Sequence, residues 1–253
     1  MVEELIYGLH AVAAALDYEP EQARELWIER QRRDRRIEAV LDTATRLGLT
    51  VHRVDRTELD RLSGSAHHQG VVARLAARQQ KYGEDDLPAL LAAVEGPLLL
   101  LVLDGVQDPH NLGACLRSAA AAGVHAVIAP ADRAAGLNAT VRKVACGGAE
   151  IAPFIPVINL ARTLRGFKEQ GIWVIGAAGA AGASLYEVDF TPSTAIVLGA
   201  EEKGLRRLTR EVCDQLARIP MVEGGVESLN VSVAAGIFLF EVRRQRGVRA
   251  GFD

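Results

Sequence analysis

The segment "PLLLLVLD", Pro97 to Asp104, is the strongest constraint on how this chain folds. It is apolar without interruption until its last residue, whereas a strand with one face in water alternates apolar and polar side chains. Such a run is typical of a strand that is buried on both faces in a parallel sheet. The segment therefore predicts a sheet that is covered by helices on both sides.

Further strand and helix segments alternate after this run. The predicted strands are "VHAVIAP", "IWVIGAA", "TAIVLGAE" and "ARIPM". The predicted helices are "NLGACLRSAAAAG" closed by Gly123, "GLNATVRKVACGG", "LARTLRGFKEQG" and a closing helix from Asn230 to Arg246. This alternation predicts a parallel α/β sheet with helices on both faces.

The first part of the chain predicts a smaller α/β domain over residues 1–76. Its expected strands are "ELWIE", "LTVHRV" and "GVVARL", and helical apolar spacing runs from Ile37 to Leu47, with Gly48 as the C-cap. Residues 77–95 are interpreted as a linker with room for one short helix, and residues 96–253 as the second domain. A chain of 253 residues is long enough to build two domains.

Composition argues against several classes of protein. The net charge of −3 gives no global signal for nucleic acid, although a local basic patch remains compatible with it. The three cysteines, Cys115, Cys146 and Cys213, are scattered and form no C-x-x-C pair, which argues against a disulfide framework and zinc. The acidic N-terminus is a poor signal peptide, and no apolar run has the length of a membrane span. We expect a cytoplasmic protein without a metal or a membrane anchor.

Two predicted strands end in loops that carry polar side chains. The first loop, Leu103 to Ala119, holds Asp108, Asn111 and Arg117, and the second, Ile196 to Thr209, holds Glu201. Ligands of open α/β sheets bind beyond the carboxyl ends of the strands, so both loops are candidate sites. The alternative is that Asp108 or Asn111 caps a helix and that the charged residues are solvated surface.

A third polar stretch, "VESLNVSVAAG", precedes the closing helix. Ser228 and Asn230 lie close together at its start, and capping of that helix explains one of them but not both. The glycine-rich run "GAAGAAGA" from Gly176 has the spacing G-x-x-G-x-x-G, which differs from the dinucleotide fingerprint G-x-G-x-x-G. Its flat backbone is nevertheless suited to close approach by an adenosine or a ribose.

The segments "DPHNLGACLRSA", "IVLGAEEKGLRRLT" and "IPMVEGGVESLNVSVAAG" resemble, in this order, the three motifs of the SpoU class of RNA ribose 2′-O-methyltransferases in the SPOUT superfamily. "YGLHAVAAAL" and "HHQGVVARL" resemble the small substrate-binding domain of that class. "HNLGACLRSA" and "LNATVRKVACGGAE" are most similar to the bacterial members that methylate a guanosine ribose in 23S rRNA. The motif from Met221 to Ser228 is one residue longer than usual.

The resemblance implies a fold, a cofactor and an assembly. The catalytic domain is expected to be a parallel sheet whose C-terminal segment forms a deep trefoil knot, and the protein is expected to be a homodimer with the last helix at the interface. S-adenosylmethionine is expected to bind at the knot. The implied donor contacts are Ala177, Ala178, Gly179, Gly199, Ile219, Met221, Ser228 and Leu229.

The resemblance also implies catalytic roles for Arg117, Asn111, Glu201, Ser228 and Asn230. Arginine stays protonated at neutral pH, so we interpret Arg117 as a clamp on the target phosphate and a stabiliser of the developing alkoxide, not as a general base. Asn111 and Asn230 are expected to hold the nucleotide or Arg117, Glu201 to orient Arg117 or Asn111, and Ser228 to bond the donor or the ribose.

A basic cluster, "ERQRRDRRIE", is the predicted contact with the RNA backbone. Its arginines are Arg30, Arg32, Arg33, Arg35 and Arg36, and the alternative is a solvated helix face. Two other functions stay open: a SpoU-class enzyme that acts on tRNA or another RNA, and a non-catalytic RNA-binding or ribosome-assembly protein. Residues 1–76 argue against a tRNA enzyme, since such enzymes typically lack this domain, and the intact polar motifs argue against lost catalysis.

Overall fold

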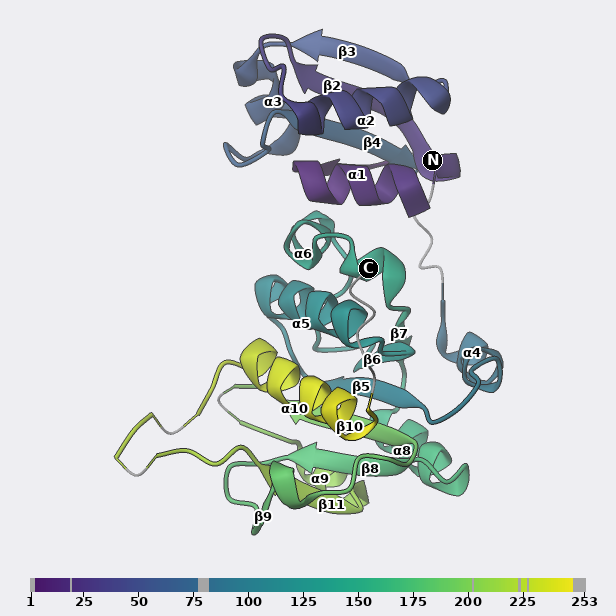
Figure 1. The fold of residues 1–253 in the computed structure, drawn as a ribbon, viewed down its shortest axis with the longest axis vertical. Coiled ribbons are helices and arrows are strands. Elements are labelled where there is room, and N and C mark those ends of the chain that lie inside the picture. The colour runs from purple at the N-terminus through teal and green to yellow at the C-terminus, as the bar shows by residue number, and fades with distance from the viewer. Residues whose placement is uncertain are drawn as a thin grey trace. The chain divides into compact units, whose positions relative to one another are not determined.

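The computed structural model describes residues 3–18, 20–76, 82–201, 203–222, 224–226 and 228–247. The chain divides into two compact units, one drawn from Met1–Lys81 and Leu137–Ile151 and the other from Tyr82–Gly136 and Ala152–Asp253 (Figure 1). The boundaries 1–76, 77–95 and 96–253 stay a prediction, and residues 77–81 of the expected linker lie outside the described residues.

The first unit is built on a mixed sheet in the order β1-β4-β2-β3. Only β2 and β3 are parallel within it. Two helices, α1 and α2, pack on one face of this sheet, and α3 packs on the other through Leu59. The strands are β1 (Glu3–Tyr7), β2 (Ala23–Glu29), β3 (Thr50–Val54) and β4 (Val71–Ala76), and the helices are α1 (Leu9–Tyr18), α2 (Arg35–Arg46), α3 (Arg56–Ser63), α6 (Ala139–Ala145) and α7 (Gly148–Ile151).

The second unit is a sheet whose described strands all run parallel, in the order β7-β6-β5-β10-β8-β11-β9. Every residue of β5 is buried, as the uninterrupted apolar run predicts. The strands are β5 (Leu99–Asp104), β6 (Ala126–Pro130), β7 (Phe154–Val157), β8 (Trp173–Ala177), β9 (Ala183–Ser184), β10 (Thr194–Gly199) and β11 (Gln215–Arg218).

Helices cover both faces of this sheet (Figure 1). One face carries α5 and α10, which pack against each other, and the other carries α4 and α8. None of the described helices is long and apolar enough to cross a bilayer. The helices are α4 (Leu87–Ala92), α5 (Pro109–Ala122), α8 (Leu160–Glu169), α9 (Arg207–Val212) and α10 (Val231–Gln245).

Two helix ends agree with the sequence prediction. Gly123 closes α5 with a left-handed backbone, φ +71°, which a glycine adopts without strain. Asn230 caps α10, and its side-chain oxygen accepts a hydrogen bond from the Ser232 amide at 2.9 Å. The strand predicted over "ARIPM" is wrong in its position, because β11 spans Gln215–Arg218 and the chain leaves the sheet before Ile219.

The chain turns back closely on itself at the end of β10. A Cβ atom on Gly199 would overlap the carbonyl carbon and the carbonyl oxygen of Gly204. The turn is closed by the Gly204 amide, which donates to the Ala200 carbonyl at 2.8 Å. Only a residue without a side chain can therefore occupy position 199 while the chain returns over it.

We expect Gly199→Ala to lower the free energy of unfolding by about 3 kcal/mol or more, since the added methyl group meets backbone that cannot rotate away. Chemical denaturation measures this change. The matched control is Gly182→Ala, where an added Cβ meets open space. Equal stability of the two variants would show that the turn after β10 is not rigid.

Candidate functional site

The carboxyl ends of four strands meet at one edge of the parallel sheet. Gly199 at the end of β10 pairs with Asp104 at the end of β5, and Ala177 at the end of β8 pairs with Ala217 in β11. The loops that follow these strands therefore emerge side by side. The sequence predicted polar residues in these loops, but their spacing alone did not show that β10 lies between β5 and β8.

Glu201 is the centre of a hydrogen-bond network at this edge. Its Oε1 accepts from Asn111 Nδ2 at 3.0 Å, from Asn230 Nδ2 at 2.6 Å and from the Val231 amide at 3.3 Å. Asn230 Nδ2 also donates to Asn111 Oδ1 at 2.8 Å. Three of the five predicted catalytic residues, distant in sequence, are thus in direct contact.

The side chain of Asn230 has two functions at once. Its oxygen accepts from the amide and hydroxyl groups of Ser232 and caps α10, while its nitrogen donates to Asn111 and Glu201. All of its ordinary hydrogen-bonding capacity is used within the protein. Asn230 is therefore a residue that positions others.

Asn111 keeps capacity for a ligand. Asp108, not Asn111, caps α5, because its Oδ1 accepts from the His110 amide at 2.8 Å. One N–H of the Asn111 amide and one lone pair of its oxygen remain after the contacts with Glu201 and Asn230. Asn111 is half-buried and can present both groups to a bound molecule.

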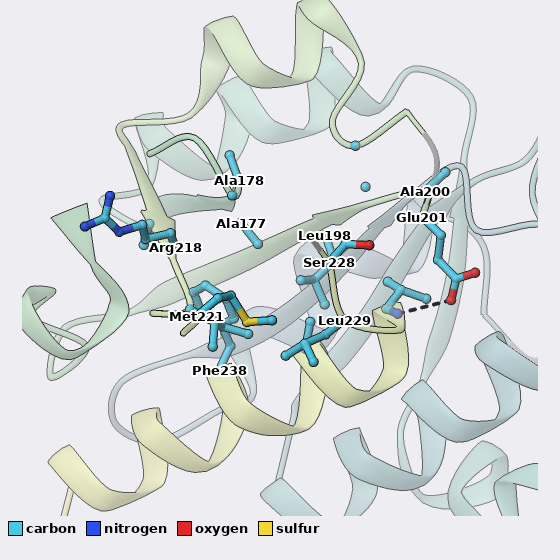
Figure 2. A pocket seen from close by; sticks show the side chains of 17 residues that line it. Ala177, Ala178, Leu198, Ala200, Glu201, Arg218, Met221, Ser228, Leu229 and Phe238 are labelled. Carbon is cyan, nitrogen blue, oxygen red and sulfur yellow. Dashed lines mark hydrogen bonds between the residues drawn. The ribbon is translucent and has the colours of Figure 1, made fainter. Parts of the chain in front are cut away.

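A cavity, named the first cavity, lies beside this network (Figure 2). It has an apolar floor formed by Leu198, Ala217 and Phe238, and Ser228 supplies a hydroxyl group at its wall. Sites for organic cofactors are usually mostly apolar with a few polar groups. All eight residues predicted to contact the donor line this cavity: Ala177, Ala178, Gly179, Gly199, Ile219, Met221, Ser228 and Leu229.

Several lining residues were missed by the sequence analysis. They are Leu198, Ala200, Gly204, Ala217, Arg218, Val231, Ala234 and Phe238. Most are apolar positions of strands or of α10 that have the pattern of ordinary core. The only signal for Arg218 was its place at a strand end, which was predicted too far along the chain; its guanidinium donates to the Ala181 carbonyl at 3.2 Å.

Arg117 lies elsewhere on α5. It is exposed and is not among the residues that line the cavity. It lies six positions after Asn111, which places the two side chains about 120° apart around the helix. The helix geometry therefore argues against the expected contact of Arg117 with Asn111 and Asn230.

Cys115, one turn after Asn111, is not a candidate nucleophile. Burial, and secondarily the charge of Glu201, raises the pKa of the Cys115 thiol to about 12. The thiol therefore stays protonated at neutral pH and has little nucleophilic character. Within the described part of the chain, no group of three or more His, Cys, Asp or Glu side chains gathers that could hold a metal ion.

The arginines predicted to contact RNA lie between β2 and the first turn of α2 in the first unit. Arg30, Arg33, Arg35 and Arg36 are exposed. Arg32 is half-buried, and its guanidinium donates to the Asp34 carboxylate and the Gln69 carbonyl. Arg32 therefore braces the loop, and its four neighbours are better placed for an RNA backbone.

The chain matches the SpoU rRNA Methylase family over residues 98–240 and the RNA 2'-O ribose methyltransferase substrate binding family over residues 5–81. The 23S rRNA (guanosine-2'-O-)-methyltransferase RlmB of Bordetella pertussis is 54% identical over 243 residues, which cover 96% of this chain and 98% of that protein.

Two solved structures share the fold. An RNA 2'-O ribose methyltransferase superposes with a TM-score of 0.82 at 26% identity, over 97% of this chain and 90% of that one. An AdoMet-bound rRNA methyltransferase from Sinorhizobium meliloti superposes with a TM-score of 0.75 at 24% identity, over 96% of this chain and 87% of that one.

Proposed function

The chain belongs to the SpoU rRNA methylase family, and we propose that it transfers the methyl group of S-adenosylmethionine to the ribose 2′-hydroxyl of a guanosine in 23S rRNA. The relative from Bordetella pertussis, whose name states this activity, matches nearly the whole of both chains and carries this proposal. The substrate-binding family match at residues 5–81 supports the same class of substrate. The chain is thus an RNA 2′-O-methyltransferase, which in this proposal acts in the cytoplasm.

The residues of the first cavity fit S-adenosylmethionine. Leu198, Ile219 and Phe238 offer apolar surface to the adenine, and an added Cβ on Gly179 would meet open space, so this backbone is accessible. Ser228 offers a hydroxyl group for the ribose or the amino acid part. When bound, S-adenosylmethionine supplies an electrophilic methyl group on a positively charged sulfur.

The network around Glu201 positions the acceptor. Glu201 and Asn230 hold the Asn111 amide in one orientation, and Asn111 offers its remaining donor and acceptor to the target nucleotide. Positioning of this kind supplies much of the rate, since oriented reactants reach effective molarities of about 10⁵ M or more.

Arg117 supplies a permanent positive charge. In this proposal its guanidinium holds the target phosphate from outside the cavity, and the 2′-hydroxyl proton leaves to water or to the phosphate. The exposure of Arg117 on α5 leaves this side chain accessible to RNA. In the first unit, the exposed Arg30, Arg33, Arg35 and Arg36 contact the RNA backbone. Arg32 stabilises the loop that carries them through its hydrogen bond to the Gln69 carbonyl.

The C-terminal segment forms a deep trefoil knot in this proposal. Two observations support it: β10 is inserted between β5 and β8, and α10 packs back on α5. The donor would then lie against the turn after β10, because Gly199 and Gly204 both line the first cavity.

Methylation is tested first by mapping ribose methylation in rRNA from cells with and without the gene. We expect one guanosine of 23S rRNA to lose its 2′-O-methyl group in the deletion strain. A methyl group that disappears from tRNA instead would transfer the activity to the other substrate class.

We expect Arg117→Ala and Asn230→Ser to lower the single-turnover methylation rate by about 100-fold or more, while donor affinity is unchanged. Serine can still cap α10 but lacks the amide nitrogen that donates a hydrogen bond to Glu201, so fraying of the helix does not explain a lower methylation rate. Calorimetry with S-adenosylmethionine measures the affinity. Arg165→Ala, an exposed arginine on α8, is the control, and a wild-type rate for Arg117→Ala would remove Arg117 from the mechanism.

Gly179→Val should leave stability unchanged but weaken S-adenosylmethionine binding by about tenfold or more, because the side chain enters the first cavity at a cost of about 1–3 kcal/mol. Calorimetry and thermal unfolding give the two quantities. Gly182→Val, which also has open space around it but lies outside the lining, is the control. Unchanged donor affinity in Gly179→Val would place the donor elsewhere.

The protein is a homodimer in this proposal, with α10 at the interface. Val233 and Phe240, which are 50% and 51% exposed, lie seven residues apart on α10 with Gly236 and Ile237 between them. This spacing gives one exposed apolar stripe. A second copy of the same stripe would cover it.

We expect Phe240→Glu to shift the protein to monomers in sedimentation equilibrium, because a buried unpaired carboxylate destabilises an interface. Tyr186→Glu, which changes an aromatic residue outside α10 that is 59% exposed, should leave the measured mass at that of the dimer. A dimeric Phe240→Glu variant would exclude this interface.

A further inference from the structure

A second cavity adjoins the first. Its volume is about 500 Å³, and it lies between the loop after β5 and the turn after β10. Small-molecule sites commonly occupy about 300–1,000 Å³. Ala200, Glu201, Gly204 and Val231 line both cavities, so a group in the second cavity lies across one layer of residues from the first.

A third cavity of about 560 Å³ continues from the second. Arg133 and Arg206 line both, and together they are named the arginine ridge. The far side of the ridge offers Arg207, whose side chain is 76% exposed, and two apolar side chains, Ile158 and Leu208, which are 85% and 50% exposed.

The ridge is held in place by the loop after β5. Arg206 donates from its backbone amide and its guanidinium to the carboxylate of Asp104, which is fully buried, while the Arg206 side chain stays 48% exposed. The turn that carries Arg133 is tied to the same loop, since the Ala135 amide donates to the Val106 carbonyl at 2.8 Å. Gln107 Nε2 donates to the Arg133 carbonyl at 3.3 Å.

The acidic groups around the ridge are mostly occupied by internal donors. Asp104 accepts from Arg206, Asp108 from the His110 amide, and Glu201 from Asn111 and Asn230. Asp132 is exposed in the third cavity. Arg207 pairs with Glu211 at 2.6 Å, and Arg133 and Lys203 are exposed, so cationic groups face the solvent along the two cavities.

We propose that single-stranded RNA runs across the arginine ridge, with the methylated nucleotide in the second cavity and a neighbouring nucleotide in the third. This inference rests on the proposed function. The ridge holds the phosphate between the two nucleotides, because guanidinium groups suit phosphate oxygens. The neighbouring base packs on Ile158 and Leu208, which removes their apolar surface from water. Unpaired bases splayed into pockets are the usual way in which proteins read RNA.

Arg133→Asn tests the ridge without disturbing its support. The backbone of Arg133 has φ +58°, a left-handed conformation that asparagine tolerates. Arg206 is left intact, because its loss would leave Asp104 buried without a partner. Arg210→Gln is the matched control, as Arg210 is an exposed arginine of α9 that lines neither cavity.

The RNA is a fragment of 23S rRNA around the mapped methylation site. In a set of otherwise identical RNAs, one linkage near the target at a time carries a neutral methylphosphonate beside a 2′-deoxy sugar. RNA affinity is measured by fluorescence anisotropy with S-adenosylhomocysteine present, and calorimetry verifies that each variant binds the donor like the wild type. Anisotropy does not depend on turnover, so it is read even if no methyl group is transferred.

We expect Arg133→Asn to weaken binding of the unmodified RNA by about tenfold, as is typical for the loss of one phosphate contact or one base contact. At one linkage adjacent to the target, neutralisation and the substitution together should weaken binding no more than either alone. Arg210→Gln should bind like the wild type. Unchanged RNA affinity of Arg133→Asn, or independent effects of the substitution and the neutral linkage at both adjacent positions, would overturn the proposed RNA path across the arginine ridge. Wild-type protein that binds this RNA but never methylates it would instead overturn the proposed function.

Discussion

At the end of β10, the carbonyl group of Gly204 occupies the place where a side chain of residue 199 would begin. This contact fixes how far the turn after β10 stands from the sheet, and the turn carries both Glu201 and Arg206. Glu201 reaches Asn111 and Asn230, and Arg206 reaches the buried Asp104. The walls of the first and second cavities therefore depend on one position that has no Cβ atom.

The network around Glu201 explains why polar residues are found beside an apolar helix. Asn230 caps α10 and also holds Asn111, so the start of α10 is fixed to the first turn of α5. Movement of α10 away from α5 would break the hydrogen bonds that Asn230 Nδ2 donates to Asn111 and Glu201. The opposite end of the helix is fixed in a similar way, since the Arg246 guanidinium donates to the carbonyls of Pro97, Leu98, Phe190 and Pro192.

Much of the second unit could be predicted from local sequence. An uninterrupted apolar run predicted β5, and glycine and asparagine at helix ends predicted the limits of α5 and α10. The strand near residue 217 was misplaced, because the apolar pair Ile219 and Met221 belongs to a cavity wall outside the sheet. The first strand and helix of the chain, β1 and α1, were missed, although α1 has its buried face at Val12, Ala15 and Leu16.

The order of strands lay beyond local pattern, because it consists of contacts between segments that are far apart in sequence, and periodicity carries no information about them. The turn from Gly199 to Gly204 is local, but its two glycines did not by themselves predict the backbone contact between them. The same limit applied to Arg32, whose neighbours in the sequence are exposed arginines but whose partner Gln69 lies in a distant loop.

Leu137–Ile151 belongs to the first compact unit although it follows α5 and β6 in the chain. Its α6 brings Lys143 over the ring of Tyr7 at 4.6 Å, and an added Cβ on Gly147 would lie 2.9 Å from that of Ala14. In a hybrid enzyme that joins a foreign N-terminal domain at the linker, the contacts between that domain and residues 137–151 would consequently be mismatched. Exchange of the first unit between relatives therefore requires the exchange of both segments together.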